Sequence, residues 1–473
     1  TATSNIGLGS GAVDSITTGD YNVGLGDNAG TAITEGSFNN AIGYAAGTAI
    51  TTGNHNVAIG RLTLYNATTP DNNTAVGNGA MESTTTGAHN TAVGMNSLNA
   101  NTTASNSTAI GYYALYANTT GDQNVAIGRN TLDANTTGSY NVATGSQALS
   151  ANTTASYNTA IGHNALQNNT TANNNFAGGY HSLRANTTGG ANTAVGYDAL
   201  LSNTTGSNNV AMGVYALDAN TIGIENVAIG YYALSGNTTA SNNVAVGKSA
   251  LYANTTGTSN VAIGKDAMDA NTTGSSNVAI GMDCLNTNTT GTGNVAMGLN
   301  ALQSNTTAGT NVAIGKDAMY SNTTGYGTAV GKGALYSQTT GTHNTAMGYQ
   351  VMESNTTGSY NSAFGREALK TNTASENTAM GYRSLYLNTT GAENVAVGER
   401  TLEANTTASN NTGVGRTALF TNTTGADNTA IGHQALRNST TSSKNTAVGK
   451  SALYANTTGH SNTSIGHASM DAN

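Results

Sequence analysis

The sequence repeats one phrase with a period of 17 residues along its whole length. A typical unit, NVAIGKDAMDANTTGSS, occupies residues 260–276, and the next unit begins at Asn277. The glycine that closes each N-x-A-x-G phrase, here called the repeat glycine, occurs 28 times, and neighbouring copies lie 17 residues apart except at two steps of 16. A period this short constrains the fold strongly, because each unit can bury its apolar residues only against the next one.

No shift in composition marks a domain boundary, so we expect residues 1–473 to form one continuous repeat array. Units in residues 1–76 are more degenerate, whereas residues 77–473 follow the regular pattern NxAxGxxALxANTTG. Charged residues make up only 8% of the chain and Trp is absent, which is unusual for an ordinary globular domain. Disordered chains lack periodic apolar positions, and this chain has them.

The period also selects the type of secondary structure. Seventeen residues are too few for a helical-hairpin repeat, which needs about 33 or more. Asn, Thr and Gly are also poor helix formers. We therefore predict an all-β fold, a parallel β-solenoid or β-roll of about 28 coils with a 17-residue period and about two short strands per coil.

Two columns of the repeat are apolar, and the positions beside them are small. The residue before the repeat glycine is apolar in 26 of 28 units, and only Ala, Gly or Ser occurs one position earlier. Because side chains alternate across a strand, we expect Ile263 inside and Ala262 outside, with Met268 and Ala267 similarly opposed. Outward positions that stay small indicate a second packed surface, and we predict a parallel homotrimer. The alternative is a single-chain solenoid with the alanine columns inside a flattened core.

Two further columns indicate close contacts between coils. The repeat glycine should mark a turn with positive φ or a close backbone approach. The Asn that opens each phrase should stack on its counterpart one coil away and form an amide ladder. The examples that we single out as structural ladder residues are Asn56, Gly60, Asn124, Gly128, Asn260 and Gly264.

The phrases at residues 56–60, 124–128 and 226–230 resemble the NSVAIG repeat in the head domains of trimeric autotransporter adhesins. Similar repeats occur in phage tail-fibre proteins. The resemblance covers nearly all 28 units, although the adhesin repeat is shorter and the extra residues here fall in the NTTG segment. It implies a left-handed, trimeric, extracellular β-roll that adheres to a host-surface glycan, a matrix protein or another cell.

Composition disfavours several other partners. The formal net charge of −8 and the absence of a basic patch argue against nucleic acid. Apolar runs are too short to span a membrane. The eight His residues, among them His55, His89, His163 and His433, show no metal-ligand spacing. Cys284 occupies a small column and indicates packing. We therefore predict no metal and no cofactor.

An enzymatic role is not expected either. Polysaccharide depolymerases need paired carboxylates in a cleft built by irregular loops, and this chain has no long insertion. Asp198, Asp266, Asp283 and Asp317 recur in one variable column that we expect to be solvated. Ice binding is disfavoured because the Thr residues are adjacent rather than spaced as T-x-T. We predict no catalytic residues.

Two further columns suggest surface chemistry. About twenty units contain Asn-Thr-Thr or a close variant, which fits the N-glycosylation acceptor rule but also suits a corner turn. Both interpretations stay open for the candidate acceptors Asn101, Asn118, Asn135, Asn254, Asn271 and Asn456. Tyrosines in variable columns are expected to be exposed and able to contact sugars or proteins. They include Tyr112, Tyr197, Tyr231, Tyr252, Tyr320 and Tyr454.

The two ends of the sequence complement one another. Joined tail to head, residues 469–473 and 1–5 match the spacing of the phrase at residues 372–377. We therefore expect subunits to stack end to end into a filament. The contact would include Thr1, Asn5, Met470 and Asn473. The alternative is that this sequence is part of a longer protein.

Together these patterns predict a non-enzymatic extracellular structural fibre with an adhesive or surface-display role. It would associate with itself, as a homotrimer, a head-to-tail filament or both. Two alternatives remain open, a phage tail-fibre shaft and the non-catalytic part of a polysaccharide depolymerase.

Overall fold

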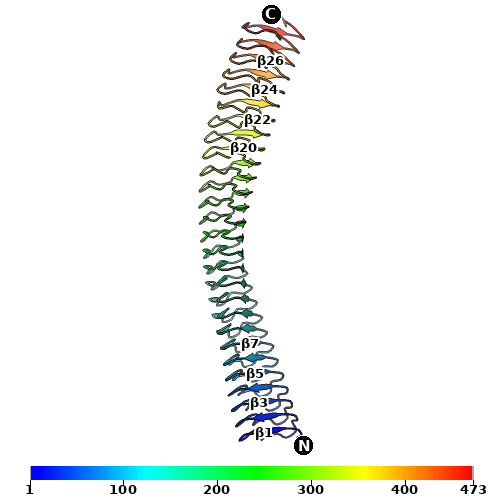
Figure 1. Ribbon diagram of the computed structural model, residues 1–473, viewed down its shortest axis with the longest axis vertical. Helices are drawn as coiled ribbons and strands as arrows, with labels where there is room; N and C mark the ends of the chain where they lie inside the picture. The colour runs from blue at the N-terminus through cyan, green and yellow to red at the C-terminus, as the bar shows by residue number, and fades with distance from the viewer. Residues whose placement is uncertain (1, 471–473) are drawn as a thin grey trace. The chain divides into compact units, whose positions relative to one another are not determined.

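The computed structural model of the protein describes residues 2–470. Contacts divide the chain into two compact units, residues 1–241 and 242–473, here called the N-terminal and C-terminal units. Each unit is a stack of coils in which one short strand per coil lies next to the strand of the following coil (Figure 1). The described residues contain no helix long and apolar enough to cross a membrane.

Fourteen strands form the N-terminal unit. Their bounds are β1 Ile6–Leu8, β2 Val23–Leu25, β3 Asn40–Ile42, β4 Val57–Ile59, β5 Thr74–Val76, β6 Thr91–Val93, β7 Thr108–Ile110, β8 Val125–Ile127, β9 Val142–Thr144, β10 Thr159–Ile161, β11 Phe176–Gly178, β12 Thr193–Val195, β13 Val210–Met212 and β14 Val227–Ile229.

Up to residue 470, the C-terminal unit also contains fourteen strands. Their bounds are β15 Val244–Val246, β16 Val261–Ile263, β17 Val278–Ile280, β18 Val295–Met297, β19 Val312–Ile314, β20 Gly327–Val330, β21 Asn344–Met347, β22 Ser362–Phe364, β23 Thr378–Met380, β24 Val395–Val397, β25 Thr412–Val414, β26 Thr429–Ile431, β27 Thr446–Val448 and β28 Thr463–Ile465.

Within each unit, successive strands pair in parallel and in register. Ala262 lies opposite Ala279, for example, so that the pairing offset equals the 17-residue period. At the two shorter steps the offset is 16, as between Ala313 and Ala329. Equivalent residues therefore form continuous columns along each unit. The predicted all-β parallel solenoid with a 17-residue period is confirmed.

The expectation of about two strands per coil is wrong, because each coil has one strand of three or four residues. The segment after the repeat glycine forms turns instead. Asp266 and Met268 have φ values of 54° and 53°, in the left-handed region, which interrupts an extended strand. The turn still bonds to its neighbour, since the Met268 N–H donates to the Cys284 carbonyl at 3.0 Å.

The predicted orientation of the strand is also wrong. Ala262 is fully buried, whereas the Ile263 residue is 38% exposed. Ala267 and Met268 are both fully buried rather than opposed, because the turn directs both side chains inward. The Leu or Met of the turn fills the coil and leaves room for little more than a methyl group on the facing strand. The alternative with alanine inside a flattened core therefore matches the coil.

A natural glycine in the alanine column shows how thin this core is. A Cβ placed on Gly413 would lie 2.6 Å from Thr401 Cγ2 and 3.5 Å from Leu402 Cδ1, both in the preceding turn. A side chain larger than alanine at this position would overlap the turn, because packed interiors tolerate little extra volume. The column stays small for a reason internal to each chain.

The repeat glycine has both predicted properties, a positive φ and a close approach of the backbone to the next coil. Gly264 has φ of 138°, and a Cβ there would lie 2.4 Å from the Gly281 carbonyl oxygen of the next coil. A real Cβ does not approach a backbone atom so closely. The chain thus requires glycine for backbone conformation and for the distance between coils.

Two columns of buried asparagine connect the coils. The Asn260 Oδ1 accepts the Asn277 N–H at 3.0 Å, while the Asn260 Nδ2 donates to the Gly274 carbonyl at 2.8 Å. In the second column, the Asn271 Nδ2 donates to the Asn254 Oδ1 at 2.9 Å and to the Gly274 carbonyl at 3.0 Å. These amides satisfy backbone groups that would otherwise be buried without partners.

Candidate functional site

The outer face of each strand carries the most unusual surface. The residues on either side of the buried alanine column point outward, and the one before the repeat glycine is Ile, Val, Leu, Met or Phe in 26 of 28 coils. Ile127, Met212, Ile314 and Met380 are among the members that are exposed. Soluble monomers seldom expose a long continuous apolar stripe, and such stripes mark interaction surfaces.

In one coil, a large residue at the first strand position compensates for a small residue at the third, which preserves the apolar face. The third strand position holds Gly178, and the first position of the same strand holds Phe176 instead of the usual Val or Thr. The Phe176 ring lies across the empty position, since a Cβ on Gly178 would be 3.3 Å from the ring carbon Cε1. The apolar covering therefore continues through a coil that lacks the usual side chain.

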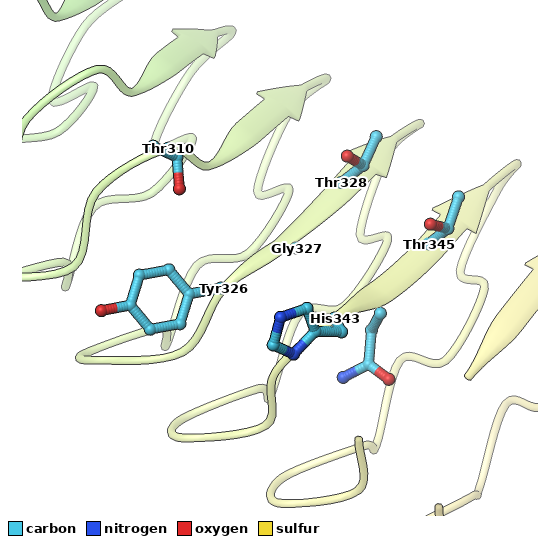
Figure 2. Close-up of a pocket in the computed structure, with 7 residues that line it drawn as sticks. Thr310, Tyr326, Gly327, Thr328, His343 and Thr345 are labelled. Carbon is cyan, nitrogen blue, oxygen red and sulfur yellow. The ribbon is translucent and has the colours of Figure 1, made fainter. Parts of the chain in front are cut away.

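A shallow cavity of about 390 Å³ lies in the C-terminal unit, at the first 16-residue step. Its lining is polar and aromatic, with side chains from three successive coils (Figure 2). The lining residues are Thr310, Tyr326, Gly327, Thr328, His343, Asn344 and Thr345. Its volume falls in the range of small-molecule sites, so a small polar ligand would fit there.

The shorter loop creates this cavity by breaking the asparagine column. Gly327 occupies the place of the usual Asn and donates its N–H to the Asn311 Oδ1 at 2.8 Å. The buried Asn311 Nδ2 has no partner among the described residues. In a regular coil the equivalent Asn294 Nδ2 donates to the Ala308 carbonyl at 2.9 Å. The sequence signalled the 16-residue step, but not the cavity.

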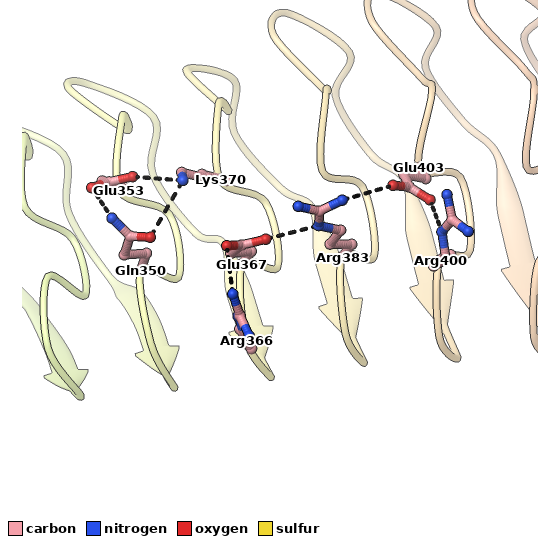
Figure 3. Close-up of polar contacts among 8 residues, drawn as sticks. All are labelled: Gln350, Glu353, Arg366, Glu367, Lys370, Arg383, Arg400 and Glu403. Atoms are coloured by element: carbon pink, nitrogen blue, oxygen red, sulfur yellow. Dashed lines mark hydrogen bonds and ion pairs between the residues drawn. The ribbon is translucent and has the colours of Figure 1, made fainter.

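Charged side chains form a ladder along four successive coils of the C-terminal unit (Figure 3). Arg383 connects two carboxylates, with Nε 2.8 Å from Glu367 Oε2 and one terminal nitrogen 3.9 Å from Glu403 Oε1. Arg400 pairs with Glu403, and Lys370 Nζ lies 3.2 Å from Glu353 Oε2. The hydrogen bond from Arg383 is the main cause that lowers the pKa of Glu367.

Aromatic side chains stack between coils in several places. In the N-terminal unit, Phe38 stacks between Tyr21 and His55, with ring centroids 5.0 and 4.8 Å apart. Tyr140 stacks on Tyr157 at 5.1 Å. These rings cover one another's faces and leave their edges at the surface. Each coil thus supports the surface side chains of the next.

The structure places the candidate tyrosines in two environments. Tyr112, Tyr197, Tyr231 and Tyr252 are exposed, as the sequence led us to expect. Tyr320 and Tyr454 are half-buried. Tyr320 stacks on the ring of Tyr336 at 5.1 Å, and the Arg437 guanidinium lies 5.8 Å from the Tyr454 ring centroid.

The candidate glycan acceptors lie inside the coils. Asn101, Asn118, Asn135, Asn254 and Asn271 are fully buried, and Asn456 is nearly so. The Asn135 Nδ2, for example, donates to the Asn118 Oδ1 at 2.7 Å and to the Gly138 carbonyl at 2.9 Å. A glycan would have to be attached to this nitrogen, which the folded coil encloses. The contacts therefore support the role of these residues in the corner turn.

The ladder residues singled out from sequence occupy equivalent places. The Asn56 Oδ1 accepts the Asn73 N–H at 3.1 Å, and the Asn124 Oδ1 accepts the Asn141 N–H at 2.9 Å. Gly60 and Gly128 both have φ of 134°. Asn260 and Gly264 make the contacts described above.

The expectation of a solvated aspartate column is wrong, because Asp198 is buried and Asp266, Asp283 and Asp317 are half-buried. His181 Nδ1 lies 3.3 Å from Asp198 Oδ1, and Lys265 and Lys316 pair with Asp266 and Asp317. Asp283 is half-buried one coil beyond Asp266. Residues 2–470 hold no group of three or more His, Cys, Asp or Glu side chains that could bind a metal ion. His55 and His163 stack on neighbouring rings, while His89 and His433 lie in other coils.

Cys284 lies in the small column as expected. It is fully buried, and burial raises the pKa of its thiol to about 12. The thiol is therefore protonated at neutral pH and a poor nucleophile, because the thiolate is the reactive form. Its role is packing.

Two of the predicted end-contact residues are placed. The Asn5 Nδ2 donates to the Gly19 carbonyl at 2.9 Å, and Met470 is exposed. Thr1 and Asn473 lie outside the described residues. End-to-end stacking stays a prediction.

Comparison with protein-family models and with curated proteins gives no match for this chain.

Proposed function

We propose that the chain is a non-enzymatic, extracellular structural fibre protein with an adhesive or surface-display role. Its outer strand face packs against further copies of the same chain, as a homotrimer of left-handed coils. The supporting observation is the outward apolar column, which recurs in 26 of 28 coils and whose members are exposed or half-buried. Burying such a column stabilises an assembly by about 25 cal/mol per Å² of apolar surface.

The arrangement of the columns favours copies that run parallel about a shared axis. Equivalent residues lie at one height in every copy only when the coils are in register. The bulky Phe176 and the small Gly178 then lie at the same level in all copies. The unusual residue sizes of this coil therefore affect the assembly at that level only. Apolar centres with polar margins are typical of obligate interfaces.

The repeated surface also suits adhesion. A fibre with many similar coils presents the same side chains many times, and weak contacts then add to a strong attachment. The stacked coils themselves provide the rigid spacing. No cleft or paired acid and base is needed for this role.

Mass measurement by sedimentation tests the proposal. We expect the native protein to have three times the mass of one chain. The triple variant I110D, I127D and I263D should fall to the mass of one chain while its β-type circular dichroism persists. A matched variant with three aspartates outside the strands, Y112D, Y231D and Y252D, should remain trimeric. A native protein with the mass of one chain or of two chains contradicts the proposal.

A further inference from the structure

The residue that directly follows the repeat glycine forms a surface column of its own, here called the post-glycine column. In the C-terminal unit, seven of its fourteen members are Lys or Arg. All seven are exposed, namely Lys248, Lys265, Lys316, Lys332, Arg366, Arg416 and Lys450. In the N-terminal unit the same column has only two, Arg61 and Arg129.

Carboxylates lie beneath three of the seven cations. The Arg366 side chain is 62% exposed and its partner Glu367 only 7%, with 3.5 Å between Nη2 and Oε1. Lys265 is 54% exposed and Asp266 only 25%, with 3.1 Å between Nζ and Oδ2. The acids hold these cations in place from below, and the column itself has seven cations against one carboxylate, Glu399, which pairs with Arg416.

Aromatic rings alternate with the cations in the middle of the column. The Arg366 guanidinium carbon lies 5.6 Å from the Tyr349 ring centroid and 5.9 Å from that of Tyr382. Lys332 Nζ lies 5.7 Å from the Tyr349 centroid. Cation–π contacts of this kind fix the charged groups without neutralising them.

The spacing of the column matches a linear ligand. Neighbouring coils are about 4.8 Å apart, so cations on adjacent coils, such as Lys316 and Lys332, lie at about that interval along the column. One sugar ring has a similar length along a polysaccharide chain. Nucleic acid fits less well, because the unit has twelve basic and twelve acidic residues in positions 242–473, and nucleic-acid binding domains carry a clear positive excess.

We propose that the post-glycine column of the C-terminal unit binds an acidic polysaccharide, with carboxylate or sulfate groups on successive sugars. The cations pair with the acidic groups, and the tyrosines contact the sugar rings between them. This site specifies a class of partner for the proposed fibre, and the inference rests on that proposed function. Each single chain carries the whole column, so binding does not require self-association.

Binding of the full-length protein to heparin and to polygalacturonate tests the site, with neutral dextran as the uncharged probe. Both acidic polymers should bind, neutral dextran should not, and affinity should fall as salt is raised. The variant K316Q, K332Q and R366Q should lose about tenfold in affinity, because each exposed ion pair contributes about a factor of two. Three cations of the same unit outside the column provide the control K370Q, R437Q and K444Q, which should keep most of the affinity.

Several outcomes would overturn the inference. They are the absence of binding to both acidic polymers, equal losses in the two triple variants, and tighter binding to a DNA oligonucleotide than to heparin. Sedimentation separates this inference from the proposed fibre. Lost polymer binding in a protein that stays trimeric contradicts only the site, and retained binding in a monomeric protein contradicts only the assembly.

Discussion

The post-glycine column contains five tyrosines and two arginines in the N-terminal unit, but two tyrosines and seven Lys or Arg in the C-terminal unit. The whole formal charge follows the same division. Residues 1–241 carry three basic and eleven acidic residues, a net charge of −8, whereas residues 242–473 carry twelve of each. The interiors do not differ, since buried alanine, leucine and asparagine columns recur in both units.

The contacts between surface side chains differ in the same way. In the N-terminal unit, Tyr180 stacks on Tyr197 with centroids 5.1 Å apart. The C-terminal unit also has ring stacks, as between Tyr320 and Tyr336, but it adds charged contacts between coils, as where Arg383 binds Glu367. The comparison shows that packing within the coil restricts which residues occupy the buried columns but not which residues occupy the exposed columns. Surface chemistry can therefore change along the chain without any change of fold.

Replacing a repeat glycine should lower the local stability of both units by similar amounts. A Cβ on Gly128 or Gly264 would lie 2.7 or 2.4 Å from a carbonyl oxygen of the next coil, at φ of 134° or 138°. We expect G128A and G264A each to cost about 3 kcal/mol or more in local stability. Native-state hydrogen exchange of the affected coils measures this cost.

The control for these variants is G190A, where φ is not positive and the nearest atom is 3.3 Å from the added Cβ. It should have little effect. Clearly unequal losses in G128A and G264A would show that the two interiors are not equivalent.

Removing a ladder amide should also affect both units, though less strongly. Without Asn124 or Asn260, the N–H of Asn141 or Asn277 loses its acceptor and stays buried. We expect N124A and N260A to cost about 2 kcal/mol each, the usual penalty for an unpaired buried group. Amide exchange in the following coil should report it, and T273A at an exposed corner position should not change it.

Serine should rescue part of this loss. Ser107 stands in the asparagine column, and its Oγ accepts the Asn124 N–H at 3.2 Å. N124S should therefore be more stable than N124A. Equal stabilities would mean that the amide column contributes packing rather than hydrogen bonds.

Transferring charge between the units should sharpen their difference in binding. Tyr197 lies next to Asp198 as Lys265 lies next to Asp266, so Y197K repeats the cation-over-carboxylate pair. The variant S146K, Y197K and V214K should raise heparin affinity about threefold through added exposed ion pairs. Isothermal titration measures the change. No gain, or an equal gain for S146Q, Y197Q and V214Q, would contradict the electrostatic explanation.

Acid should act in opposite directions on the coil of Glu367 and on the coils of Asp133 and Asp218. The lowered pKa of Glu367 means that its contribution to stability is present above the usual glutamate pKa and is lost as pH falls through the lowered value. Burial raises the pKa of Asp133 and Asp218, so their folded forms bind protons more tightly. Their contribution is present below the usual aspartate pKa and is lost as pH rises through the raised values.

Between neutral pH and about pH 4, near the ordinary carboxyl range, exchange protection should therefore fall around Glu367 and rise around Asp133 and Asp218. The variants E367Q, D133N and D218N should each remove the pH dependence of their own coil. Parallel changes in all three coils would contradict the assigned causes.

The sequence was sufficient for the period, the parallel stack and the role of the repeat glycine. It did not decide which face of the strand is inside, because alternation opposes Ala262 and Ile263 without saying which of them is buried. The residue before Ala262 carried a usable signal. The first strand position shares a face with Ile263 and is Val or Thr in most coils. A face that accepts so many hydroxyl groups is the outer one.

Other features lay beyond sequence reasoning. The turn after the repeat glycine puts Met268 in the left-handed region, which a Met or Leu seldom adopts, so local propensity favoured a strand there. The cavity at Gly327 depends on how one deleted residue shifts three loops. Cations in the post-glycine column are visible in the sequence, but their exposure above the carboxylates required the structure.

The direction of the hydrogen bonds has a mechanical consequence. The Val261 N–H donates to the Asn277 carbonyl in one neighbouring coil, and the Gly264 N–H donates to the Val246 carbonyl in the other. Tension along the stack is therefore borne by the layer of bonds that joins one coil to the next. A coil that does detach releases 17 residues, which can extend to roughly 55–60 Å from a rise of about 4.8 Å. Under flow, such a tether would lengthen in steps of one coil, and this extension would come before its attachment to a surface failed.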